Sequence, residues 1–148
     1  MSILIYFILG LLTSLLFPPY FFLPLGFIIF PSLCFLLESN KENYSDKNIF
    51  NKFSIFGFGF FISYLFWIKN PFFVFEETKN FFLVFLLLII FLSIILGFIF
   101  TIIFKLGKKI PIIFLIPFMF TASEYLISIF FYGFPWFTFS LLLSSNEY

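Results

Sequence analysis

The longest apolar run that neither a charged residue nor a proline interrupts covers residues 81–104. About 20 predominantly apolar residues suffice for a helix to cross the hydrocarbon core of a bilayer. Backbone N–H and C=O groups in hydrocarbon must be paired within the segment, so this run predicts a helix. The chain as a whole is also strongly apolar, since 63% of its 148 residues are hydrophobic and only 10% are charged. The sequence therefore predicts an integral membrane protein.

Charged or proline-containing breaks divide the chain into five apolar segments. Pro18 and Pro19 mark the first break, because proline lacks an N–H and its ring clashes with the preceding turn. The polar stretch 38–52 predicts a surface loop that is too short for a domain. We therefore predict an all-α membrane protein, a polytopic bundle of about five transmembrane helices, at about residues 3–17, 21–37, 53–68, 81–104 and 110–131.

The lysines predict the orientation of this bundle. Lys105, Lys108 and Lys109 lie in one turn that has no acidic residue, which marks it as cytoplasmic by the positive-inside rule. Counting spans backward places the N-terminus and the 38–52 loop in the cytoplasm as well. The Pro18–Pro19 turn and everything after Phe131 then face the other side. No basic residue precedes the first apolar run, so we expect it to stay as a helix rather than be cleaved as a signal peptide.

Several function classes are disfavoured by composition. The chain has no His and a single cysteine, Cys34, within an apolar run, so we expect no disulfide, no metal site and no cofactor. A thiol in such surroundings stays protonated, and no nucleophile–base pair can be assembled from the other residues. We therefore predict no catalytic residue in this chain. The net charge of +1 and the scattered lysines also argue against a nucleic-acid partner.

Small residues at helical spacing predict close helix packing. Ser93, Gly97 and Thr101 share one face of their helix, and Gly10 and Ser14 share one face of another. Such residues let neighbouring backbones approach closely in a membrane.

Aromatic residues and one acid mark the candidate sites. Trp67 and Trp136 are expected to anchor at the headgroup level, near a turn made by Gly133, Phe134 and Pro135. Glu124 is the one ionisable residue within a predicted span, where a carboxylate costs about 2.5–3.5 kcal/mol unless it has a partner or water. It is either a hydrogen-bonded or wet structural residue or a functional one.

These landmarks together resemble the N-terminal membrane region of apolipoprotein N-acyltransferase, a bacterial inner-membrane enzyme. LGLLTSLLFPPYFFLPLGFIIFPSL is similar to the family's first hairpin, and GFGFFISYLFWI to its third span. SEYLISIFFYGFPW resembles the family's Glu and Gly-Phe-Pro-Trp pattern, with Glu124 nine positions before Gly133. Ile127 stands where the family has Arg, so no role of that Arg can be carried over.

The resemblance implies a membrane support for lipoprotein N-acylation. In that family a nitrilase-like domain uses Glu, Lys and Cys to move an acyl chain from a phospholipid to the N-terminal cysteine of a lipoprotein. These 148 residues hold no such domain, so the chain is expected to be inactive alone, with phospholipid as its partner and lipoprotein only in the full-length enzyme. Glu124 and residues 133–136 are then the candidates nearest the substrates. The alternatives are a small polytopic scaffold or lipid-binding protein without catalysis and, less favoured, a small transporter.

Overall fold

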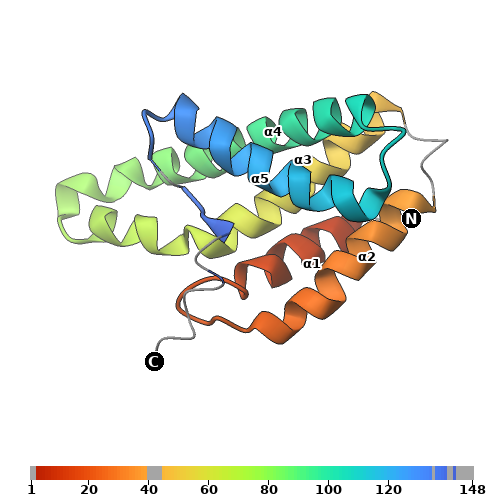
Figure 1. Ribbon diagram of the computed structural model, residues 1–148. Coiled ribbons are helices and arrows are strands. Elements are labelled where there is room, and N and C mark those ends of the chain that lie inside the picture. Colours follow the sequence, from red (N-terminus) through yellow and green to blue (C-terminus); the bar gives the residue numbers. More distant parts are fainter. Residues whose placement is uncertain (1–2, 40–44, 135, 140–141, 143–148) are drawn as a thin grey trace.

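The computed structural model describes residues 3–39, 45–134, 136–139 and 142, and within them every regular element is helical. The all-α prediction is therefore confirmed for this part of the chain (Figure 1). The elements are α1 (Ile3–Ser14), η1 (Leu23–Leu25), α2 (Gly26–Glu38), α3 (Asp46–Tyr64), η2 (Phe66–Phe73), η3 (Glu76–Phe81), α4 (Phe82–Leu106) and α5 (Ile112–Phe130), where η denotes a 3-10 helix.

Two to three of these helices are long and apolar enough to cross a membrane. Glu76–Leu106 and Ile112–Phe130 qualify directly, and α3 with η2 qualifies if this pair, bent by 50°, is one span. The 12 residues of α1 extend only about 18 Å, less than the roughly 30 Å of a hydrocarbon core. The five-span count therefore stays a prediction.

The outer surface of α4 is apolar from Leu83 to Ile102, before the exposed Lys105 in its last turn. Large hydrophobic side chains on this helix remain exposed, among them Leu83, Leu87, Phe91, Phe98 and Ile102. A contiguous surface of this kind is unusual on a soluble protein and marks a membrane or protein contact. Together with the uncharged length of the helix, it identifies this chain as a membrane protein.

The prediction of a surface loop over residues 38–52 was wrong for its second half, because α3 already begins at Asp46. Ser45 caps the helix, since its side chain accepts a hydrogen bond from the Asn48 N–H at 3.3 Å. Asp46 in the first turn faces the positive end of the helix dipole and pairs with Lys105 Nζ at 2.7 Å. Lys52, expected on the loop, is buried, with its ammonium 5.5 Å from the centre of the Tyr6 ring.

Two helices also end earlier than predicted. α1 stops at Ser14 instead of Phe17, because the chain tightens into a turn in which the Phe17 N–H donates to the Ser14 carbonyl. A residue that precedes proline disfavours helical geometry, which is consistent with this ending before Pro18. α3 stops at Tyr64 instead of Ile68, and the chain continues into the bent η2.

The core is organised around α3, which lies between α1 and α4 (Figure 1). Its aromatic side chains are buried and pack edge to face with those of other helices. The Phe53 ring lies 4.7 Å from the Phe100 ring of α4, and the Phe56 ring lies 5.8 Å from the Phe120 ring of α5. The Phe100 and Phe120 rings lie 5.1 Å apart and close this triangle of helices. Aromatic packing thus joins α3, α4 and α5.

Glycines bring the backbone of α3 into direct contact with its neighbours. A Cβ atom on Gly10 of α1 would overlap the Phe56 carbonyl oxygen, and one on Gly59 of α3 would overlap the Phe7 carbonyl oxygen. Gly97 of α4 lies against α3 in the same way, where its Cβ would overlap the Ser54 hydroxyl. The predicted close approach is confirmed at Gly10 and Gly97.

Replacing Gly10 tests this contact. We expect Gly10→Ala to lower the free energy of unfolding by about 1–3 kcal/mol, because the methyl group would push two helix backbones apart. Gly26→Ala is the matched control, since its Cβ would lie in ordinary contact, 3.5 Å from the Phe30 ring. Unfolding in detergent micelles followed by circular dichroism measures both variants. Equal stabilities would show that α1 and α3 do not touch at Gly10.

Candidate functional site

Glu124 on α5 is half-buried and holds the segment that follows the helix. Its Oε2 accepts a hydrogen bond from the Phe139 N–H at 3.0 Å. In the described part of the chain no lysine lies within salt-bridge distance of this carboxylate. Thr121, one turn earlier, is exposed and its hydroxyl donates to the Pro117 carbonyl at 3.0 Å. The Glu124 carboxylate therefore makes a hydrogen bond to a backbone N–H, which is the arrangement expected if Glu124 has a structural role.

This hydrogen bond joins the segment after α5 to the core of the bundle. The Phe139 ring lies 5.1 Å from the Phe17 ring and 4.9 Å from the Phe120 ring. Phe137 is buried in the same region, 5.7 Å from the Phe60 ring. The segment after α5 thus lies at the end of the bundle where α1 ends, beside the turn that contains Pro18 and the exposed Pro19.

α5 ends at Phe130 in a Schellman motif formed by Tyr132 and Gly133. The Gly133 N–H makes the longer of its two hydrogen-bonded loops. This N–H donates to the Ser128 carbonyl at 2.8 Å, and the Tyr132 N–H donates to the Ile129 carbonyl at 3.3 Å. Tyr132 and Gly133 both have positive φ, at 55° and 85°, a conformation that glycine adopts without strain. The prediction that this sequence ends the helix is confirmed at Gly133. Pro135 lies outside the described residues.

Trp136 lies within an aromatic cluster just after this turn. Its ring is 5.0 Å from the Phe131 ring and 4.9 Å from the Phe134 ring. The Trp136 Nε1 is buried and has no acceptor among the described residues, while the Phe134 ring is half exposed. Trp67 stands apart from this cluster, exposed on η2. Glu124, Gly133, Phe134 and Trp136 therefore gather at one end of α5, and Trp67 does not join them.

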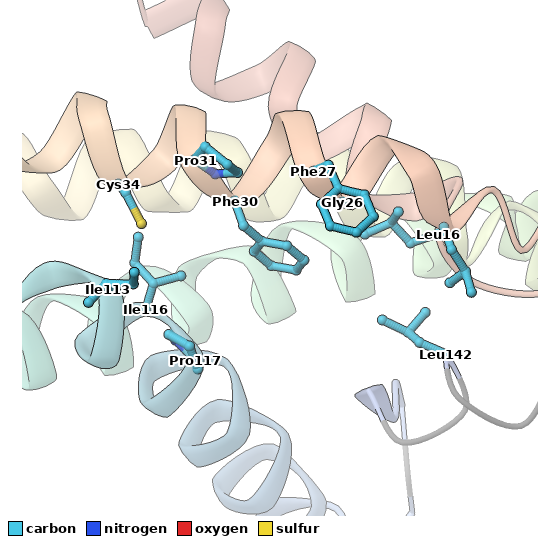
Figure 2. Close-up of a pocket in the computed structure, with 11 residues that line it drawn as sticks. Leu16, Gly26, Phe27, Phe30, Pro31, Cys34, Ile113, Ile116, Pro117 and Leu142 are labelled. Carbon is cyan, nitrogen blue, oxygen red and sulfur yellow. The ribbon is translucent and has the colours of Figure 1, made fainter.

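A groove between α2 and α5 was not predicted. It has a volume of about 790 Å³ and is almost entirely apolar (Figure 2). Its walls include Gly26, Phe27, Phe30 and Pro31 from α2 and Ile113 and Pro117 from α5. The mid-helix prolines were the available signal, because each removes a helix hydrogen bond and disturbs straight packing. A sequence shows each proline but not that both line one groove.

Within the described residues no three His, Cys, Asp or Glu side chains lie close enough to hold a metal ion. The gathered residues are one carboxylate already bonded to main chain, a glycine turn and aromatic rings. Such a set can orient an apolar or amphiphilic molecule at the end of α5.

Substitution of Glu124 tests its role as a tether. We expect Glu124→Leu to release the segment after α5, because leucine offers no acceptor to the Phe139 N–H and an unsatisfied buried donor costs about 1–3 kcal/mol. Glu124→Gln keeps an acceptor oxygen and should retain the segment. Tryptophan emission in a Trp67→Phe background reports the environment of Trp136 alone and should shift to the red only for Glu124→Leu. Identical spectra for all three proteins would exclude the tether.

The chain was compared with protein-family models, curated proteins and solved structures. The family model of the apolipoprotein N-acyltransferase N-terminal domain matches residues 9–147, nearly the whole chain and including the Glu124 to Trp136 region. No significant match was found among curated proteins or solved structures. Because the match extends over far more than half of the sequence, this chain belongs to the family of apolipoprotein N-acyltransferase N-terminal domains.

Proposed function

We propose that this chain is the membrane-embedded N-terminal part of an apolipoprotein N-acyltransferase. In the complete enzyme a phospholipid acyl chain would pass to the N-terminal cysteine of a lipoprotein. The observation that carries the proposal is the family match over residues 9–147, on a helical bundle with an apolar exterior. The nitrilase-like chemistry would be supplied by a domain that these 148 residues do not contain, so the chain alone would be inactive.

The proposed topology has five crossings, with the N-terminus in the cytoplasm of a bacterium and the bundle in its inner membrane. The crossings are α1, η1 with α2, α3 with η2, α4, and α5. Residues 15–25, between α1 and α2, are uncharged and mostly apolar, so they could lie within the membrane and add to the length covered by these two short helices. This supports one crossing by each helix. Lys105, Lys108 and Lys109 between α4 and α5 support a cytoplasmic position for that turn.

In this arrangement, Glu124 and the turn with Gly133, Phe134, Pro135 and Trp136 would lie on the periplasmic side, nearest the substrates. The buried Trp136 Nε1 supports this assignment, because a buried donor without a partner costs free energy that a ligand acceptor would recover. The half-exposed Phe134 ring beside it offers an apolar surface at the membrane boundary. The tether from Glu124 would keep both rings in place.

Replacing Trp136 in an enzyme that also carries the catalytic domain tests this proposal. Trp136→Phe removes the N–H but keeps an aromatic ring, so we expect acyl transfer to fall severalfold while protein abundance stays close to wild type. Trp67→Phe, at an exposed site on η2, is the matched control and should leave both unchanged. Mass spectrometry of lipoproteins for the third acyl chain, with immunoblots for abundance, gives the two readouts.

Two outcomes would count against the proposal. Parallel losses of acyl transfer and abundance would assign Trp136 a purely structural role. Normal acylation by the catalytic domain in the absence of this chain would favour the scaffold alternative, in which the bundle binds lipid or protein without serving acyl transfer.

A further inference from the structure

We propose that the groove between α2 and α5 holds one acyl chain of a resident phospholipid whose ammonium headgroup pairs with Glu38. This site is separate from the Glu124 and Trp136 region and does not rest on a role in acyl transfer. It follows from the apolar lining of the groove (Figure 2), the exposed side chains on its rim and the charge of Glu38 in the adjoining hollow.

The groove is built to take an apolar chain. Its volume of about 790 Å³ falls within the range of pockets that enclose a small molecule. The 13 residues of α2 extend about 20 Å, and the depth of one leaflet of hydrocarbon is about 15 Å. The groove is lined on α2 from Gly26 to Cys34, about 12 Å, so an acyl chain lying along α2 would find apolar walls over most of the depth of a leaflet.

The groove opens sideways toward lipid rather than toward water. Phe27 and Ile113 stand on its rim and are 85% and 65% exposed, as side chains that face lipid would be. The Phe30 ring projects from α2 across the interior and packs edge to face on Phe120 at 5.9 Å (Figure 2). The rims at Phe27 and Ile113 would be the entry for a lipid tail, with the Phe30 ring as one wall of the groove.

The mouth of the groove carries a negative charge. A second hollow of about 320 Å³ continues the first, sharing Cys34 and Ile113 with it, and Glu38 is its one charged lining residue. In the described part of the chain no lysine lies within salt-bridge distance of Glu38. A carboxylate at the membrane surface above an apolar groove complements a headgroup that presents an ammonium ion. Phosphatidylglycerol, which has no cationic group, does not fit this mouth.

Photo-cross-linking and native mass spectrometry test the proposal on the full chain in nanodiscs. A phosphatidylethanolamine with a diazirine in one acyl chain should label peptides of α2 and the first turns of α5. Ile113→Trp should lower bound phosphatidylethanolamine severalfold, because the indole would fill the junction of the two hollows. Phe114→Trp is the matched control, since Phe114 is 69% exposed and lines neither hollow.

The headgroup is tested separately. Glu38→Gln should lower the preference for phosphatidylethanolamine over phosphatidylglycerol by about threefold, as expected for one solvent-exposed ion pair. Labelling spread evenly over the exposed face of α4, or equal lipid retention by Ile113→Trp and Phe114→Trp, would overturn the acyl-chain site. Cross-links from the groove to a second copy or another polypeptide would assign it to a protein instead. An unchanged headgroup preference in Glu38→Gln would overturn the pairing with Glu38.

Discussion

Close backbone contact with α3 is the interaction on which the rest of this bundle depends. Lipid tails are as apolar as the side chains, so helices in a membrane gain little from hydrophobic exclusion and rely on packing. Gly10 and Gly59 let α1 and α3 touch along their backbones, and Gly97 does the same for α3 and α4. Phenylalanine rings then fill the space around this three-helix contact, and Phe56 and Phe100 fix α5 through Phe120.

Both candidate sites lie against α5, so their positions depend on how α5 packs in the bundle. On one side the Glu124 carboxylate accepts a hydrogen bond from the Phe139 N–H, in the segment that follows the Gly133 turn and Trp136. On the other side α5 faces α2, where the Phe30 ring packs on Phe120 and the apolar groove lies between the two helices. Both proposals, positioning at one end of the bundle and lipid binding at one flank, therefore depend on where α5 packs.

Much of this architecture could be predicted from the sequence. The long uncharged run predicted α4 within two residues at each end, and the Gly133 ending of α5 followed from its residue type. The start of α3 was predicted too late, at residue 53 instead of Asp46. Hydropathy indicates which residues lie in the membrane, and a helix can begin outside it. Residues 46–52 are polar, yet the Ser45 cap and Asp46 make them the first turns of a helix.

The candidate sites were harder to predict from the sequence, because they depend on contacts between segments that are distant in sequence. Glu124 was recognised as a residue that needs a partner, but the partner is a main-chain N–H, and no sequence pattern marks which one. Lys52 is buried above Tyr6 only because α1 and α3 pack so closely. The groove depends in the same way on how α2 and α5 pack, which neither helix specifies alone.

The five-crossing topology is tested most directly by measuring on which side of the membrane each turn lies. In a Cys34→Ser background, the exposed residues Tyr20, Asn48, Lys108 and Tyr132 are replaced one at a time by cysteine and labelled with an impermeant maleimide in bacterial spheroplasts. Five crossings predict labelling at Tyr20 and Tyr132, and at Asn48 and Lys108 only after permeabilisation. Labelling of Tyr20 and Asn48 under the same condition would contradict the account, because η1 with α2, which lies between these two positions, would then not cross the bilayer.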